Sequence, residues 1–402
     1  MPAARCIRAL ALPLVLGLTA LWAGRAQSAE KVWVELESPS NEVTVKSPVG
    51  LVEIKGWTGS GLRGGHDVLI AIDRSSSVWS ASGADIDGDG RVGRDRSEFD
   101  LILDFDKKST DPDDTILRAE LAAARKLIER MDPKTTRMGV MSFEGGARVH
   151  APIGSSKAQL LAALLEIPQI PRASSGGGTS FDTALKLARI QFEATPRPAD
   201  PAERRNFSVI LLSDGTPTAP TPVEHAEAFA VLAARDAAKL GVRIYAFAIG
   251  PEAIGNRKVY EEMTNVTGGE LVLVDKPAEV IDFVPHLALT SIARVEIDNL
   301  SSSEKARAIR LFPDGTFDGY APLREGWNQI RITSIGADGY ERVVDRRVFF
   351  EKTAEVSQEQ QAKVRDLIRD LKVRTLETEL AEAARKKLEE QGPRRNVSIE
   401  TE

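Results

Sequence analysis

Five uninterrupted apolar runs lie between residues 66 and 289, and segments with helical periodicity separate them. The runs are DVLIAID, MGVMSF, FSVILLSD, VRIYAFAIG and ELVLVD. A strand that is apolar at every position is buried on both faces, and strands that alternate with helices form a parallel sheet covered on both sides. The pattern predicts an open, doubly wound, mostly parallel α/β domain over residues 63–289. Such domains bind ligands beyond the carboxyl ends of their strands.

Oxygen-bearing side chains occur at three points of this predicted domain. Asp73, Ser75 and Ser77 end or directly follow the first run. Thr179 follows a glycine-rich loop, and Asp214 ends the third run. Three hydroxyls and two carboxylates, with no thiolate or imidazole, are hard ligands that suit Mg²⁺ or Mn²⁺ and disfavour zinc.

The order of these elements carries a resemblance. Asp-x-Ser-x-Ser, Gly-Gly-Thr and Ser-Asp-Gly, each behind its strand or loop, resemble the von Willebrand factor A family, whose members use them as a metal-ion-dependent adhesion site. The resemblance implies that Ser75, Ser77 and Thr179 bind the metal by their hydroxyls. It also implies that Asp73 and Asp214 act mainly through bound waters, and that a partner protein's carboxylate fills an open position on the metal.

Two positions differ from the family pattern. The glycine that is usual between the two serines is Ser76, and Val78 and Trp79 follow Ser77. Neither difference removes a ligand, but Ser76 would strain the turn if a positive φ were needed there. The alternative for all three motifs is a serine-rich turn, a glycine loop and a β-turn without metal.

A second acidic cluster, DIDGDG, lies in a 37-residue insertion, residues 78–114. Strand-to-helix connections usually have about 2–6 residues, so an insertion of this length beside the crevice favours a role in partner selection. The cluster matches the opening of a calcium loop, with Val92 as its apolar anchor. Arg96 replaces the usual glutamate at the twelfth position, so Asp95 or Glu98 would have to substitute; the alternative is a solvated acidic loop. The residues of the possible calcium loop are Asp85, Asp87, Asp89, Arg91 (through its carbonyl) and Asp95.

Residues 1–29 have the layout of a secretory signal. Arg5 and Arg8 precede an apolar run over residues 9–23, and small residues follow it. A retained membrane anchor is the alternative. The only cysteine, Cys6, lies inside this segment, so the mature chain has none. We expect export to the periplasm or the medium, with no membrane-spanning segment after cleavage.

Charge and motif content exclude several functions. The net charge is −6, and it becomes −9 once Arg5, Arg8 and Arg25 leave with the signal, which disfavours nucleic acid and anionic membranes as partners. The four histidines lack metal-ligand spacing, and no nucleophile elbow or phosphate-binding loop occurs. His66 and His225 are expected to be solvated or capping residues. The protein is therefore not expected to be an enzyme.

The flanks differ from the central domain. Residues 30–62 and 290–352 contain alternating strand patterns that are too short for separate sandwiches, and together they predict one Ig-like β unit. Residues 353–402 predict an amphipathic helix and a tail. The helix either packs on its own protein or serves as a coiled-coil or partner-docking helix. Its apolar positions are Val364, Leu367, Leu371, Leu376, Leu380 and Leu388.

These features together predict an exported, metal-dependent, adhesion-type module that binds an acidic group of a partner protein. The class-level alternative is an envelope assembly or scaffold factor that acts through the flanking β unit and the terminal helix. A metal-dependent subunit of an enzyme complex, similar to the chelatase subunits with this domain, is disfavoured by the signal.

Overall fold

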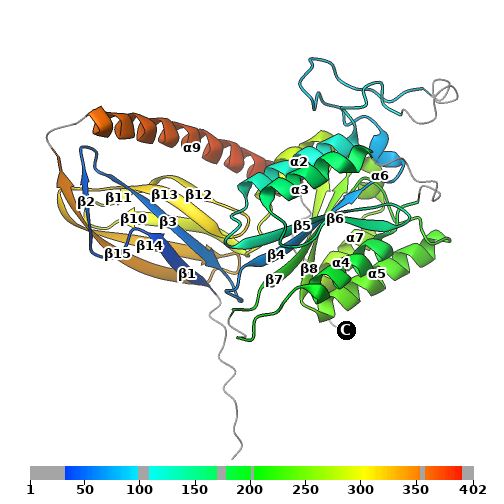
Figure 1. Cartoon of the computed structure of the whole chain (residues 1–402), viewed down its shortest axis with the longest axis horizontal. Coiled ribbons are helices and arrows are strands. Elements are labelled where there is room, and N and C mark those ends of the chain that lie inside the picture. The colour runs from blue at the N-terminus through cyan, green and yellow to red at the C-terminus, as the bar shows by residue number, and fades with distance from the viewer. Residues whose placement is uncertain (1–31, 98–107, 170–177, 201–202, 354–357, 392–402) are drawn as a thin grey trace, which may run out of the picture.

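The computed structural model describes residues 32–97, 108–169, 178–200, 203–353 and 358–391. It consists of an α/β domain and a β-sandwich side by side, with one long helix along the sandwich (Figure 1). The predicted signal segment, Glu98, most of the glycine-rich loop and the tail after residue 391 lie outside the described residues. Within them, no helix is long and apolar enough to cross a membrane.

The α/β domain has a six-stranded sheet in the order β6-β5-β4-β7-β8-β9. Its five predicted runs form the parallel strands, which confirms the predicted fold class. The sixth, β6, is an antiparallel edge strand; its sequence, ARVHA, is short and half-exposed, so no apolar run marks it. The strands are β4 (His66–Asp73), β5 (Thr136–Phe143), β6 (Ala147–Ala151), β7 (Asn206–Ser213), β8 (Val242–Ile249) and β9 (Glu270–Val274).

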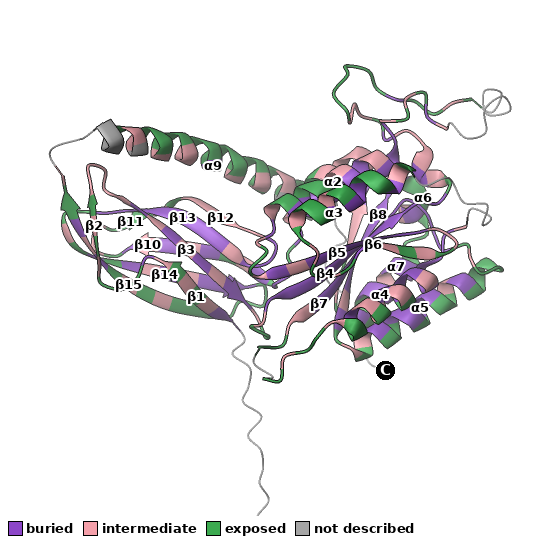
Figure 2. Cartoon of the chain, in the orientation of Figure 1, coloured by how far each residue is buried: buried purple, intermediate pink, exposed green. Residues whose placement is uncertain are grey.

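Helices cover both faces of this sheet, and two apolar cores separate them from it. One face packs against α2, α3 and α8, and the other against α4, α5 and α7. Every residue of β4 is buried (Figure 2), as an apolar run in the middle of a covered sheet requires. The helices are η1 (Ser77–Trp79), α2 (Ile116–Arg130), α3 (Lys157–Glu166), η2 (Ile167–Gln169), α4 (Phe181–Ala194), α5 (Val223–Lys239), α6 (Gly250–Gly255), α7 (Lys258–Thr267), η4 (Pro277–Glu279), α8 (Val280–Phe283) and η5 (Val284–His286).

The two flanks build one β-sandwich, which confirms that part of the predicted fold; its Ig-like character stays a prediction. The sheets have the orders β1-β3-β13-β12 and β11-β10-β14-β15-β2, so each contains strands from both flanks. β13 has no clear strand pattern in the sequence, because Gly319 and Pro322 interrupt its apolar residues. The strands are β1 (Trp33–Ser38), β2 (Val43–Ser47), β3 (Leu51–Gly59), β10 (Ile292–Asn299), β11 (Glu304–Lys305), β12 (Arg307–Leu311), β13 (Thr316–Pro322), β14 (Gly326–Gly336) and β15 (Glu341–Lys352).

A turn of the sandwich is inserted into the α/β domain at the amino ends of its strands. Asp314, fully buried between β12 and β13, accepts hydrogen bonds from the hydroxyls of Thr135 at 2.6 Å and Thr136 at 3.2 Å. Its backbone oxygen accepts from the Trp57 indole nitrogen at 2.9 Å. The two threonine bonds join the sandwich to the α/β domain at a buried carboxylate, and the Trp57 bond fixes the turn within the sandwich.

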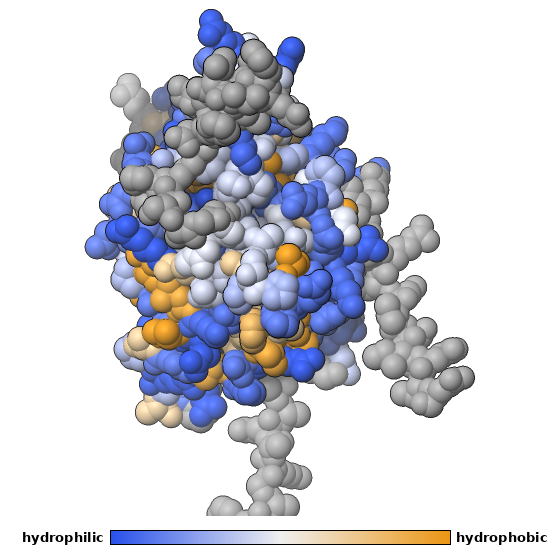
Figure 3. Space-filling model, turned by 90° about the vertical axis from the view of Figure 1, so that its right-hand side faces the viewer, coloured by the Kyte–Doolittle hydropathy of each residue, from blue (hydrophilic) through white to orange (hydrophobic). Residues whose placement is uncertain are grey.

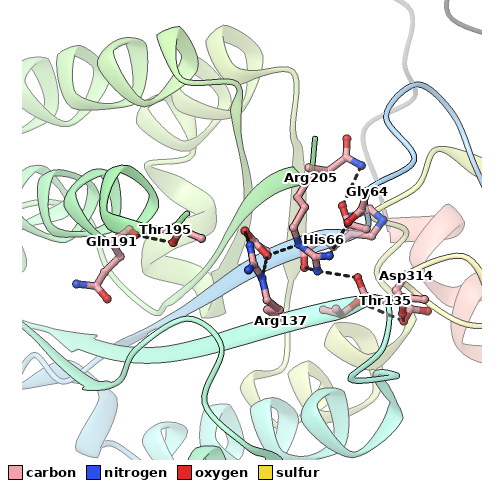
Figure 4. Close-up of polar contacts among 12 residues, drawn as sticks. Gly64, His66, Thr135, Arg137, Gln191, Thr195, Arg205 and Asp314 are labelled. Atoms are coloured by element: carbon pink, nitrogen blue, oxygen red, sulfur yellow. Dashed lines mark hydrogen bonds and ion pairs between the residues drawn. The ribbon is translucent and has the colours of Figure 1, made fainter. Parts of the chain in front are cut away.

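The same end of the sheet contains an ion network (Figure 4). Asp67 is fully buried and accepts from both Arg137 and Arg205. Arg205 also donates to the backbone oxygens of His66 and Thr135. The expectation that His66 is solvated or capping is wrong: it is 2% exposed, and burial lowers its pKa to about 4. His225 is exposed, as expected.

The terminal helix α9 (Gln358–Gln391) packs on the sandwich with charged residues. Arg374, 7% exposed, donates to Glu53 at 2.6 Å and lies 3.4 Å from Asp318. Further along, Lys387 reaches Glu279 of the α/β domain at 2.6 Å. The predicted apolar stripe is only partly covered, because Leu376 and Leu380 are 57% and 61% exposed, and Val373 beside them is 48% exposed.

Candidate metal centre

The carboxyl ends of β4 and β7 meet at the point where the strand order reverses. β4 is the first strand of the sheet, and the chain adds β5 on one side of it and β7 on the other. Ile72 lies opposite Leu212 in the parallel pair, so Asp73 ends β4 beside Ser213, and Asp214 follows directly. A topological switch point of this kind is where doubly wound sheets bind ligands.

Hydrogen bonds connect four of the predicted residues. The Ser75 backbone nitrogen donates to Asp73 Oδ1 at 2.7 Å. The Ser75 and Ser77 hydroxyls lie 3.1 Å apart, and Ser77 Oγ donates to Asp214 Oδ1 at 2.6 Å. Asp73 Oδ2 accepts from the Ser213 hydroxyl at 2.5 Å. Residues 137 positions apart in the chain thus form one polar group.

The turn that holds the two serines is unstrained. Ser76 has φ −66° and ψ −23°, the ordinary right-handed conformation, so the strain considered from the sequence does not arise. Its neighbour Arg74 is buried and lies 3.9 Å from Glu144. The turn therefore projects both hydroxyls without needing a glycine.

Thr179 lies at the entry to α4, beside the segment that follows Asp214. Its backbone nitrogen donates to the Thr218 hydroxyl at 2.9 Å, and its backbone oxygen accepts from the Thr218 nitrogen at 2.8 Å. Its hydroxyl makes no hydrogen bond to any residue that the structure describes. The structure thus fixes the Thr179 backbone and leaves the hydroxyl for a ligand, although it does not join this hydroxyl to the other four side chains.

Glu120 is a third acidic residue of the centre, and the sequence motifs did not indicate it. It lies on α2, which packs against β4 and η1, and its side chain is fully buried. Neither carboxylate oxygen has a hydrogen-bond partner among the residues that the structure describes. A signal was present: in TILRAELAAARKLIERM, Glu120 occurs four residues after Ile116 and three before Ala123, on the face that should be apolar.

The carboxyl groups of the centre perturb one another. Burial raises the pKa of Asp73, and burial together with the Asp73 carboxylate raises the pKa of Asp214. Burial raises the pKa of Glu120 well above its ordinary value, and Asp73 and Asp214 add to the effect. The protein thus gathers three carboxyl groups in a buried place, where their charge is offset either by bound protons or by a cation.

The residues present fit a hard divalent cation. The donors are hydroxyls and carboxylates, which suit Mg²⁺ or Mn²⁺. The unpartnered oxygens of Glu120 and the raised carboxyl pKa values are further signs, because buried polar groups normally have partners. Figure 3 views the end of the molecule where these strands finish: residues of intermediate hydropathy lie at its centre, with hydrophilic residues to the right and hydrophobic patches to the left and below.

The acidic insertion is organised around Asp114. This buried carboxylate accepts from the backbone nitrogens of Ile86 at 2.6 Å and Gly93 at 2.8 Å. Val92 is 50% exposed, so it is not the expected anchor; Ile86 packs on the core instead. Asp95 accepts from the Ala81 nitrogen.

Two sets of carboxylates in the insertion lie within 4.8 Å of one another: Asp85 with Asp87 and Asp89, and Asp87 with Asp111 and Asp113. Asp95 belongs to neither set. The sequence had proposed Asp95 or Glu98 as the substitute for the missing glutamate, whereas the structure brings aspartates from the far end of the insertion. All of these are exposed or half-buried groups.

Comparison with known protein families gives a match to the central part of the chain. The family model of the von Willebrand factor type A domain matches residues 68–216. No curated protein matches the sequence significantly.

Several solved structures are similar. The conserved hypothetical protein BatB from Bacteroides thetaiotaomicron has 19% identity over 53% of this chain and 91% of its own, with a TM-score of 0.37. Three N-terminal domains of the type V pili tip protein Mfa5 from Porphyromonas gingivalis have 11% identity over 80% of this chain and 78% of their own, with a TM-score of 0.36. Proximal thread matrix protein 1 from the mussel byssus, with zinc in its MIDAS motif, has 16% identity over 61% of this chain and 48% of its own, with a TM-score of 0.35.

Proposed function

The chain contains a von Willebrand factor type A domain, and we propose that this domain binds Mg²⁺ at the carboxyl ends of β4 and β7 and, through it, an acidic group of a partner protein. The observation that supports the proposal most strongly is the connected group of Asp73, Ser75, Ser77 and Asp214, with the unpartnered Glu120 beside it. Export to the periplasm or the medium is part of the same proposal.

Each residue has a separate task in this proposal. Ser75, Ser77 and Thr179 supply neutral hydroxyl ligands, while Asp73 and Asp214 orient those hydroxyls and hold waters. Asp73 already orients the turn, because it accepts from the Ser75 backbone and the Ser213 hydroxyl. A bound Mg²⁺ would supply an electrophilic position that a partner's carboxylate oxygen can complete.

A capture experiment tests the function. Wild-type protein and Thr179→Ala, immobilised in Mg²⁺, are exposed to envelope extract with and without EDTA. We expect a set of proteins that wild type retains, that EDTA releases, and that Thr179→Ala fails to retain. Thr183→Ala, one turn further along α4, is the matched control and should behave as wild type. Retention of the same proteins by all three variants, whether or not EDTA is present, would contradict the proposal.

The alternative function, envelope assembly, rests on one observation. α9 packs on the sandwich through Arg374 and leaves Val373, Leu376 and Leu380 exposed. A helix that docks through charged residues keeps an apolar stripe for another protein. In the same capture experiment, this function would be favoured if partner proteins were retained equally with and without EDTA but were lost in Leu376→Glu/Leu380→Glu.

Calcium binding by the insertion stays a prediction. If Asp85, Asp87 and Asp89 bind Ca²⁺, Asp87 is shared with the second set of carboxylates, and Asp87→Asn should weaken calcium binding most. Calorimetric titration of Ca²⁺ into wild type and Asp87→Asn checks this, with the remote Asp236→Asn as control. Equal heats in all three proteins would identify the insertion as a solvated acidic loop.

A further inference from the structure

The amino ends of the parallel strands surround a cavity of about 460 Å³, at the end of the α/β domain remote from the metal centre. Its walls come from the segment after β3, the loop after α4 and the first residues of β5, β7 and β8. Figure 4 shows two of the lining residues, Arg137 and Arg205. Small-molecule sites usually occupy about 300–1,000 Å³, so the space is large enough for a small ligand.

The charge around this cavity is opposite to that of the whole chain. The protein carries a net charge of −6, yet the cavity lining contains five arginines and one acidic residue, Asp67. A concave surface lined by one sign of charge focuses the electrostatic potential and attracts the opposite ion.

Two of the five arginines form a fixed base. Arg137 contacts both Asp67 oxygens, at 2.7 and 2.6 Å. Arg205 donates to Asp67 at 2.7 Å, and its other guanidinium nitrogens donate to backbone oxygens. Two guanidinium groups share one carboxylate, so this base retains a net positive charge.

The other three arginines, Arg197, Arg204 and Arg243, have no acidic partner within the described part of the chain. Arg197 lies over the Phe207 ring at 5.6 Å, and its neighbours in the wall include Pro196 and Pro198. The guanidinium group is the side chain best shaped to bind an oxyanion with two parallel hydrogen bonds. The prolines and Phe207 add an apolar surface next to these cations.

We propose that this cavity binds a small organic anion: a phosphate or carboxylate group held by Arg204 and Arg243, with an apolar body against the proline-lined wall. The site is separate from the metal centre and does not depend on it. The anion neutralises charge that the protein itself leaves unbalanced, while Asp67 keeps Arg137 and Arg205 in place.

Two probes distinguish the sources of the oxyanion. Phenyl phosphate and phenylacetate share an apolar ring and differ in the acidic group. Each is titrated calorimetrically into the full chain in EDTA, so that no divalent metal takes part. The variants are Arg204→Gln/Arg243→Gln and, as control, Arg125→Gln on the exposed side of α2; unchanged thermal midpoints confirm that all are folded.

We expect saturable binding of at least one probe by wild type, about tenfold or more weaker binding in Arg204→Gln/Arg243→Gln, and no change in Arg125→Gln. The tighter probe identifies the acidic group. Rising NaCl should weaken the interaction, as an ionic contact requires. The proposal is overturned if neither probe saturates wild type at millimolar concentrations, or if the control loses as much affinity as the double variant.

Discussion

Asp67→Ala should lower the free energy of unfolding by about 3–5 kcal/mol, the usual cost of removing one partner from a buried ion pair. Asp67 is fully buried and is the acceptor for two guanidinium groups. Without it, Arg205, whose side chain is only 14% exposed, keeps its charge in a poorly solvated place. Urea unfolding followed by circular dichroism measures the change.

The matched control is Asp236→Ala. Asp236 also contacts a cation, Lys239 at 2.7 Å, but its side chain is 57% exposed. Exposed pairs contribute little to stability, so the control should unfold at nearly the wild-type urea concentration. Similar midpoints for Asp67→Ala and Asp236→Ala would show that the ion network does not hold this end of the domain together.

Glu120→Gln should change the metal-free and metal-bound proteins in opposite directions. In the metal-free protein it removes a buried acid that has no hydrogen-bond partner in the described part of the chain and lies near two other carboxylates, and we expect stabilisation by about 1–3 kcal/mol. In Mg²⁺ it removes negative charge from the centre, and we expect about tenfold weaker Mg²⁺ binding. Thermal unfolding measures the stability of the metal-free protein, and calorimetry measures Mg²⁺ affinity. If Glu120→Gln lowered both the stability and the Mg²⁺ affinity, the role of Glu120 would be purely structural.

The pH dependence follows from the same group. Because burial raises the pKa of folded Glu120, the unfolded chain loses its proton first as the pH rises. The folded state then holds more protons, so the stability of the metal-free protein falls as the pH increases above the ordinary carboxyl value of about 4. Glu120→Gln should flatten this decline. Equal slopes for wild type and variant between pH 4 and 7 would contradict the assignment.

Strand positions were predictable where burial dictates composition. β4, β7 and β8 are covered on both faces, so their sequences are continuous apolar runs, and the residues that end or follow them could be placed at the crevice without coordinates. β6 and β13 could not be predicted in this way, because an edge strand and a glycine-containing strand lack a continuous apolar run. The pairing of both flanks in one sandwich was foreseen from their length, but the register of β2 beside β15 depends on contacts about 300 residues apart.

The site was predictable only in part, for a related reason. Asp73, Ser75, Ser77 and Asp214 stand in recognisable spacings, whereas Glu120 lies in a helix whose other buried residues are mostly apolar. His66 was assigned to the solvent because it starts a strand, yet the sandwich turn around Asp314 covers this end of the sheet. The arginines around the amino-end cavity come from separate segments, so no local pattern indicates them.

The most direct test of the metal-dependent function is a calorimetric titration of Mg²⁺ into wild type, Asp73→Ala and Thr179→Ala, with Thr183→Ala as control. Asp73 accepts hydrogen bonds from Ser75 and Ser213, whereas the Thr179 hydroxyl is left for a ligand, so the two substitutions remove different parts of the centre. We predict saturable binding by wild type and the control, and at least about tenfold weaker binding by the other two. Mg²⁺ binding that is unchanged in both Asp73→Ala and Thr179→Ala would contradict the assignment.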